Sequence, residues 1–200
     1  VGDLDGDGHN DIAVAVCTDP DRTERSVVFW GGPARTGENR ERTVYDGTKT
    51  EIETSSAQSM TIADLRGDGR SQLIICQGGT SIVHSVTSPV VEFDAQRQRE
   101  QIAVLESGDA MKILAGRTRP GPLPQVAVIN HETGRVRGDE RVCIYLGGAD
   151  GYVPERKIEL PGWAAVDGEL FDHNDNGYPD VLISNCSENA PHMDPGTFLY

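Results

Sequence analysis

The chain is poor in the residues that mark several common classes of protein. Of its 200 residues only 6% are aromatic and four are cysteine, and 18 basic residues stand against 32 acidic ones, a net charge of −14. No apolar run approaches the roughly 20 residues that a membrane-spanning helix needs, so we expect no membrane insertion. The shortage of basic residues argues against a nucleic-acid partner, because phosphate binding needs a basic surface.

The cysteines are too few and too widely spaced for a dense disulfide framework. They are Cys17, Cys76, Cys143 and Cys186. We expect mainly small buried residues at these positions, and the sequence alone leaves their pairing open.

Acidic residues, in contrast, are concentrated at the start of the chain, in residues 3–11 (loop 1). Oxygen-bearing side chains occupy positions 1, 3, 5 and 9 of this loop, and Gly8 occupies position 6. Four carboxylates this close together repel one another unless a cation lies between them, and calcium accepts six to eight such hard oxygen ligands. Gly8 permits the positive φ that turns the next carbonyl inward. The sequence therefore predicts a calcium site formed by Asp3, Asp5, Asp7, Asp11 and the carbonyl of His9.

The same pattern returns at residues 172–180 (loop 4), with Gly177 at position 6. Only two of its side-chain ligands carry a charge, so we expect weaker binding than in loop 1. The predicted ligands are Asp172, Asn174, Asn176, Asp180 and the carbonyl of Tyr178. Two intact loops predict about two calcium ions per chain.

Two degraded copies lie between the intact loops. Residues 64–72 (loop 2) keep Asp64 and Asp68 but carry Arg66 at position 3 and Gln72 at position 9. We expect the Arg66 guanidinium to neutralise the two acids, and whether loop 2 also binds metal stays open. Residues 117–125 (loop 3) have lost their acids, so no metal is expected there. The four loops start at residues 3, 64, 117 and 172, with spacings of 61, 53 and 55, which indicates one structural unit repeated along the chain.

The loops differ from the helix-loop-helix calcium motif, which needs a bidentate Glu at position 12 and flanking helices. Position 12 is Val14, Ile75 or Ile183 in the three recognisable copies. The segments that follow these loops are short and largely β-branched, which is typical of buried strands. The sequence therefore predicts loops that connect strand to strand.

Each repeat also contains further strands at corresponding places. Residues 26–32, 141–148 and 197–200 form one set, residues 42–45 and 156–160 a second, and residues 59–63 lead into a loop. Four short strands per repeat, separated by turn residues, are the pattern of a propeller blade. The predicted fold class is therefore all-β.

These loops and strands resemble the FG-GAP or VCBS repeat family, which includes the β-propeller of integrin α subunits and many bacterial extracellular proteins. Residues 148–152, Gly-Ala-Asp-Gly-Tyr, are also similar to the family's Gly-x-x-Gly-aromatic turn. The resemblance covers nearly the whole chain. It implies that residues 1–200 are one β-propeller segment of four-stranded blades. The count of repeats gives about three and a half blades, so we expect the segment to be part of a larger ring.

The resemblance and the calcium loops together predict a non-catalytic, calcium-stabilised scaffold for binding or adhesion, with a protein or glycan as partner. Weak calcium loops fill only where calcium is near millimolar, so we expect a secreted, cell-surface or periplasmic location. No catalytic constellation is identified. Two alternatives stay open: the propeller domain of a lyase-like enzyme that degrades extracellular polysaccharide, and a structural spacer in a large surface protein.

Overall fold

A computed structural model of the chain describes residues 1–18, 23–33, 43–78, 86–118, 121–131, 141–186 and 196–200. Every regular element in these ranges is a β-strand, which confirms the all-β prediction. No helix that could cross a membrane is found among them. The strands are β1 (Ile12–Val14), β2 (Thr23–Pro33), β3 (Thr43–Ser55), β4 (Ala57–Ala63), β5 (Gln72–Gln77), β6 (Val86–Phe93), β7 (Arg99–Ser107), β8 (Ala110–Gly116), β9 (Gln125–Asn130), β10 (Val142–Leu146), β11 (Lys157–Leu160), β12 (Asp167–Phe171), β13 (Asp180–Ser184) and β14 (Thr197–Leu199).

The strands form four antiparallel sheets in chain order: β1–β3 (sheet 1), β4–β7 (sheet 2), β8–β11 (sheet 3) and β12–β14 (sheet 4). Loops 2, 3 and 4 each join the first strand of a sheet to the second, as predicted. Loop 1 is closed at its base by Gly2 and Asp11, whose backbones exchange hydrogen bonds of 3.1 and 2.8 Å. Every repeat thus places its loop at an equivalent strand connection.

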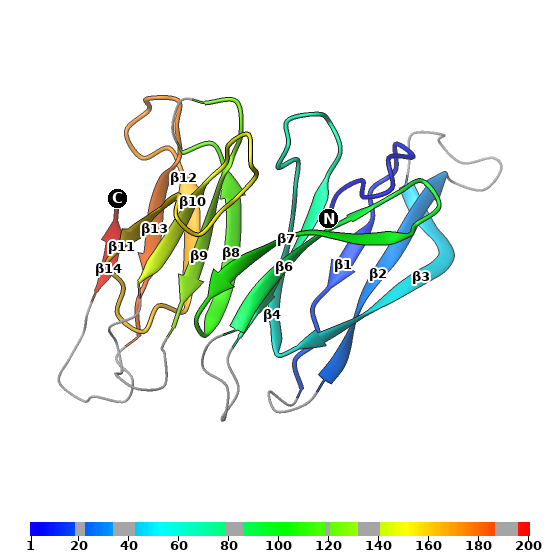
Figure 1. The fold of residues 1–200 in the computed structure, drawn as a ribbon, viewed down its shortest axis with the longest axis horizontal. Coiled ribbons are helices and arrows are strands. Elements are labelled where there is room, and N and C mark those ends of the chain that lie inside the picture. Colours follow the sequence, from blue (N-terminus) through cyan, green and yellow to red (C-terminus); the bar gives the residue numbers. More distant parts are fainter. Residues whose placement is uncertain (19–22, 34–42, 79–85, 119–120, 132–140, 187–195) are drawn as a thin grey trace.

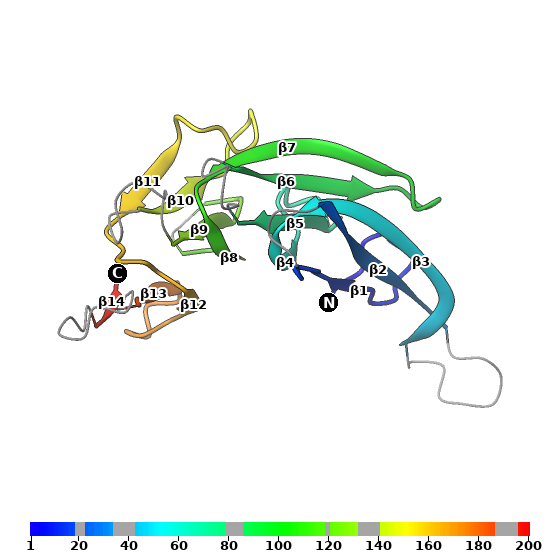
Figure 2. The same cartoon turned by 90° about the horizontal axis from the view of Figure 1, so that it is seen from below.

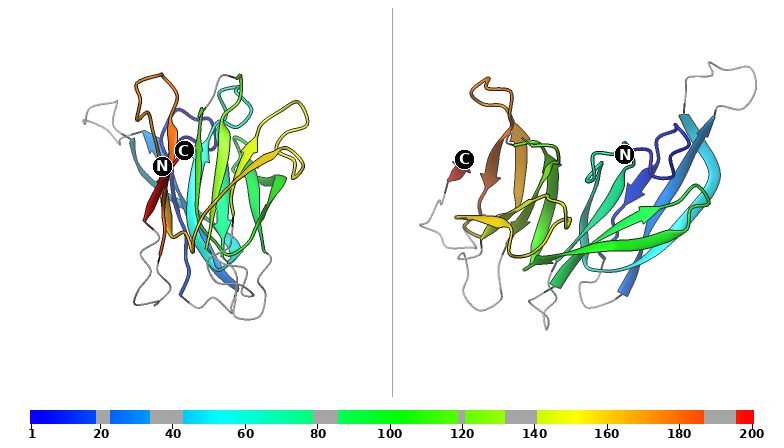
Figure 3. Two further views of the ribbon diagram at one scale, coloured as in Figure 1. Left: turned by 90° about the vertical axis from the view of Figure 1, so that its left-hand side faces the viewer. Right: turned by 45° about the horizontal axis from the view of Figure 1, so that its top comes forward.

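The four sheets follow one another along an arc (Figure 2). Strand β8 contacts β4 on one side and β12 on the other, so the first strands of neighbouring sheets lie side by side on the concave side. Strands β7 and β11 lie on the convex side. All four loops project from the same edge of the arc, at the top of Figure 1, and the right-hand view of Figure 3 shows the same order of sheets.

The hydrophobic core lies between the sheets. In β5, Leu73 and Ile75 pack toward sheet 1, whereas Ile74 and Cys76 pack toward sheet 3. The alternation follows from the two-residue period of a strand, and burial on both faces explains why this strand reads as an unbroken apolar run. Strand β9 of sheet 3 repeats the arrangement: Val126 and Val128 pack toward sheet 2, and Ala127 and Ile129 pack toward sheet 4.

Tyr145 and two of the cysteines are buried in the core, whereas Cys17 is exposed. Tyr145 is buried in the core between sheets 2 and 3, where its hydroxyl donates to the carbonyl of Glu106 at 2.7 Å. Cys76 and Cys143 are buried as expected, but Cys17 is exposed because it lies beyond the end of β1. No disulfide joins any two of the four cysteines, all of which lie in the described ranges.

Candidate metal centre

Loop 1 brings three carboxylates together. One oxygen from each of Asp3, Asp5 and Asp11 lies within 4.8 Å of the others. Asp11 is fully buried and Asp5 nearly so. Asp7, also a predicted ligand, lies outside this group of three, and its Oδ1 accepts from the backbone N–H of His9 at 2.8 Å. The convergent carboxylates offer the hard oxygen donors that calcium prefers.

Backbone donors fix the orientation of these carboxylates. Both oxygens of Asp3 accept hydrogen bonds, from Gly6 N at 2.8 Å and from Gly8 N at 2.9 Å. Asp11 accepts from Leu4 N at 2.7 Å and from Gly31 N, in β2, at 2.8 Å. An ionised carboxylate has about four lone-pair sites, so these bonds leave capacity for a cation.

The electrostatics of Asp11 also fit a cation. Burial raises the pKa of its carboxyl group above the ordinary value, the hydrogen bonds from Gly31 and Leu4 oppose this, and the charges of Asp5 and Asp7 raise it further. A cation among the acids would offset both the burial and the repulsion, because it favours the ionised form. Loop 1 therefore fits a calcium ion.

Two positions of the loop have positive φ, although the sequence pointed to only one. Position 6 is Gly8 (φ 86°), Gly69 (φ 87°) and Gly177 (φ 87°) in loops 1, 2 and 4. Position 4 is also left-handed in each, and its residues are Gly6 (φ 77°), Gly67 (φ 70°) and Asp175 (φ 57°). The paired glycines of loops 1 and 2 carried this signal, but loop 4 hides it because aspartate tolerates the left-handed region.

Loop 4 shares two backbone bonds with loop 1, from position 6 to the acid at position 1 and from position 2 to the acid at position 9. Asp172 accepts from Asn176 N at 3.0 Å and from Gly177 N at 2.7 Å, and Asp180 accepts from His173 N at 3.0 Å. The amide nitrogen of Asn174 lies 3.4 Å from Asp180 Oδ2. The predicted ligands of loop 4 thus share one turn, with fewer charges than loop 1.

The position-7 residues of loops 1 and 4 adopt matching contacts. His9 N donates to Asp7 at 2.8 Å, and Tyr178 N donates to Asn176 at 2.9 Å. Coordination through the carbonyls of His9 and Tyr178 stays a prediction.

In loop 2 the side-chain amide of Gln72 makes a contact that a cation would make in a calcium loop. Gln72 is fully buried, and its Oε1 accepts from Leu65 N at 2.7 Å, as Asp11 accepts from Leu4 in loop 1. Its Nε2 donates to the carbonyl of Arg70 at 2.8 Å. Arg70 occupies position 7, whose carbonyl would face the ion in a calcium loop.

Loop 3 uses the same device, although two of its residues, 119 and 120, lie outside the described ranges. Gln125 Oε1 accepts from Thr118 N at 2.7 Å, and its Nε2 donates to the carbonyl of Leu123 at 3.1 Å. A neutral glutamine at position 9 therefore bridges positions 2 and 7 in both degraded loops. The sequence showed the substitution but not this consequence.

The predicted neutralisation of Asp64 and Asp68 by Arg66 is wrong. Arg66 instead pairs with Glu92 of β6 at 2.9 Å, and Arg70 approaches the same carboxylate at 3.4 Å. The reason is that the Glu92 carboxylate is almost buried and requires a counter-charge, whereas Asp64 already accepts three backbone hydrogen bonds.

Asp5 of loop 1 does have an arginine partner, which sequence reasoning missed. Arg97 Nε lies 2.8 Å from Asp5 Oδ2, although the two residues are 92 positions apart. No local pattern links them, because Arg97 belongs to the turn between β6 and β7 of the neighbouring sheet.

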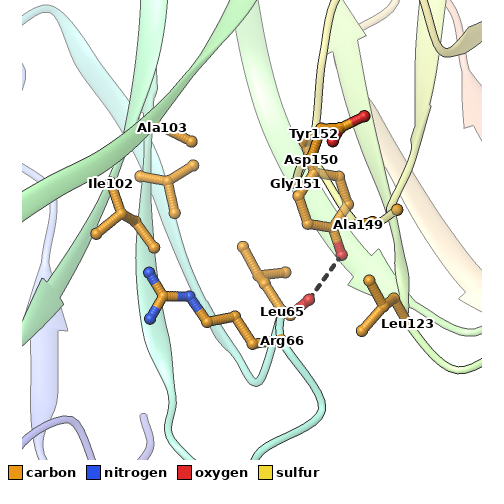
Figure 4. A pocket seen from close by; sticks show the side chains of 11 residues that line it. Leu65, Arg66, Ile102, Ala103, Leu123, Ala149, Asp150, Gly151 and Tyr152 are labelled. Carbon is orange, nitrogen blue, oxygen red and sulfur yellow. Dashed lines mark hydrogen bonds between the residues drawn. The ribbon is translucent and has the colours of Figure 1, made fainter.

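A hollow of about 400 Å³ lies beside loop 2, between sheets 2 and 3 (Figure 4). The Tyr152 hydroxyl closes one end of it, within 2.8 Å of the Pro124 carbonyl and 3.3 Å of the Leu65 carbonyl, and so connects loops 2 and 3. The hollow combines an apolar wall with one residue of each charge. Its lining includes Leu65, Val90, Ile102, Leu123, Arg66 and Asp150.

Comparison with known families identifies one repeat. The family model described as an FG-GAP-like repeat matches residues 3–75, from the first ligand position of loop 1 into β5. This confirms the resemblance inferred from the sequence over these residues. No curated protein matches the chain.

Asp64 makes loop 2 sensitive to acid without a metal ion. Burial would raise its pKa from 3.8, but the hydrogen bonds from Gly69, Gly67 and Asp68 outweigh burial and lower it. The ionised carboxylate therefore stabilises the folded state above about pH 4, and this contribution is lost as the pH falls through the lower folded-state pKa. We expect Asp64→Asn to lower the free energy of unfolding by about 1–2 kcal/mol at pH 7 and by less near pH 3, in urea titrations with chelator present. An equal loss at both pH values would contradict this.

Restoring acids in loop 2 should create a calcium site. We expect the double variant Arg66→Asn/Gln72→Asp to bind one more calcium ion than the wild type in isothermal titration calorimetry, because it regains the ligand pattern of loops 1 and 4. The single variant Gln72→Leu should melt at a lower temperature with or without calcium, since it removes both hydrogen bonds of the amide. An unchanged ion count in the double variant would show that position 9 does not decide metal binding.

Proposed function

We propose that this chain, of which residues 3–75 are an FG-GAP-like repeat, is a calcium-stabilised β-propeller segment that serves as a non-catalytic scaffold for binding or adhesion outside the cell. The observation that carries the proposal is the convergence of Asp3, Asp5 and Asp11 in a loop that backbone hydrogen bonds already hold in shape.

The arrangement of the sheets supports a propeller. The four sheets of the chain lie side by side, with their first strands on the concave side and apolar cores between successive sheets. Blades around a central channel pack in this way. We infer that residues 1–200 contribute about three and a half blades to a larger ring.

Calcium would have a structural role in this scaffold. In loops 1 and 4 it would bind in the loop that leads into β1 or β13. There it would offset the charge of the loop carboxylates. An ion that binds only the folded state adds about 2.7 kcal/mol of stability when its concentration is 100 times Kd. Near-millimolar calcium outside the cell or in the periplasm suits such sites.

The hollow beside loop 2 is the place where we expect a protein or glycan partner to bind. Loops presented on a rigid scaffold commonly carry the function of a fold. The apolar wall of the hollow, formed in part by Ile102 and Leu123, lies beside the charged groups of Arg66 and Asp150. Apolar walls with a few polar groups are typical of ligand sites.

Calcium titration tests the metal assignment. We expect chelator-treated protein to bind about two ions in calorimetry, with a clear rise in melting temperature. Asp3→Ala and Asp172→Ala should each remove one ion, whereas Asp68→Ala in loop 2 should leave the count unchanged. Absence of both binding and thermal stabilisation in the wild type would overturn the calcium proposal.

A glycan array, read with calcium and with chelator, tests the scaffold role. We expect Ile102→Arg to weaken partner binding at least about tenfold, because the longer charged side chain would fill the hollow. Val104→Arg, on the same strand but outside the hollow, is the matched control. An absorbance assay for unsaturated sugar products runs in parallel, and product formation would replace the scaffold by the lyase-like alternative.

A further inference from the structure

Arg97 connects loop 1 to two sheets at once. Its Nε lies 2.8 Å from Asp5 Oδ2, and its Nη1 lies 2.7 Å from Asp46 Oδ2 and 2.6 Å from Thr48 Oγ1, both in β3. The guanidinium also lies 4.8 Å from the ring centroid of Trp30, a buried residue of β2. One side chain of sheet 2 thus contacts loop 1 and two strands of sheet 1.

The backbone at Arg97 indicates that this placement is specific. Arg97 N donates to the Asp94 carbonyl at 2.8 Å to close the turn between β6 and β7, and Arg97 itself has a φ of 63°. Glycine is the residue favoured at such a left-handed turn position. An arginine in this conformation must be stabilised by its surroundings. Residues with such unfavourable backbone conformations are concentrated at functional sites.

The partner carboxylate needs a cation. The Asp5 side chain is only 3% exposed, and its other oxygen accepts a hydrogen bond from Asp7 N at 3.2 Å. Asp5 also belongs to the group of three acids in which one oxygen of each lies within 4.8 Å of the others. A buried carboxylate is stable in the ionised form only when it is paired. Arg97 provides that pairing, and the Arg97 charge borders the place where we expect calcium.

We propose that Arg97 is a built-in counter-ion of loop 1, which holds the calcium-free loop in shape and opposes calcium binding there. The proposal rests on the calcium site proposed above. Arg97 stabilises the calcium-free state through Asp5, Asp46 and Trp30, so calcium must bind against a positive charge already in contact with one of its ligands. Through this contact, calcium binding in loop 1 is coupled to the packing of sheet 1 against sheet 2.

Replacing Arg97 by methionine separates these effects, because methionine keeps an unbranched apolar side chain over Trp30 and removes the charge. The measurements are calorimetric calcium affinity and melting temperature in chelator, made in an Asp172→Ala background so that loop 1 is read alone. Arg97→Met should melt at a lower temperature in chelator, and it should bind calcium about tenfold more tightly. Repulsion between a nearby unit charge and a divalent ion changes the affinity by about this factor even in a highly polar medium. Arg97→Gln, a polar neutral replacement, is the second variant.

Arg25→Met is the matched control. Arg25 pairs with Glu51 at 2.9 Å on the exposed face of sheet 1, so this variant removes the same charge without touching loop 1. We expect it to change calcium affinity less than about twofold, because exposed charges are screened by solvent and salt.

The outcomes distinguish the counter-ion from the calcium site itself. Calcium binding by the parent protein with equal or lower affinity in both Arg97 variants would overturn the counter-ion role and leave the calcium site standing. Binding that appears only when Arg97 is replaced would support the counter-ion directly. Absence of binding in the parent and in both variants would overturn both proposals.

Discussion

One hydrogen bond recurs in all four loops, and the shape of each loop depends on it. The side chain at position 9 accepts from the backbone N–H of position 2, at 2.7 Å in loops 1, 2 and 3 and at 3.0 Å in loop 4. Position 9 is also the start of the strand that follows, or lies directly before it. The bond therefore ties the turn to a strand that is fixed by the core, and it forms whether the acceptor is aspartate or glutamine.

The repeats differ in the groups that stabilise the oxygen atoms of the loop, which are either positive charges or hydrogen-bond donors. Loop 1 gathers carboxylates and has Arg97 at its edge, whereas loops 2 and 3 use the amide of Gln72 or Gln125 to bridge the turn. Loop 4 lies between these cases, since the amide of Asn174 faces Asp180 at 3.4 Å. The guanidinium and the amides thus meet the same requirement, and the calcium proposed for loops 1 and 4 would meet it too, because oxygens brought close together without a donor or a cation are costly.

Packing between the sheets holds the fold together although the loops differ in composition. Alternate residues of β5 and β9 belong to the cores on the two sides of each strand, so neighbouring sheets hold one another through side chains as much as through loops. A loop that has lost its acids still lies on a packed framework, and Tyr152 adds a bridge between loops 2 and 3. The absence of acids from one loop therefore leaves the arrangement of the sheets intact.

The sequence by itself determined the all-β class, the place of each loop between two strands, and the positions from which oxygens can converge. These follow from the two-residue period of strands and from glycine and aspartate at fixed spacing, which are local properties. Position 4 of the loop could also have been read from Gly6 and Gly67, whereas Asp175 conceals it. Only the tertiary structure decided that Arg66 pairs with Glu92, that Arg97 reaches Asp5, and that glutamine closes the degraded loops. Those contacts depend on which strands and loops the sheets bring side by side, and on burial that requires each charge to find a partner, so no local pattern contains them.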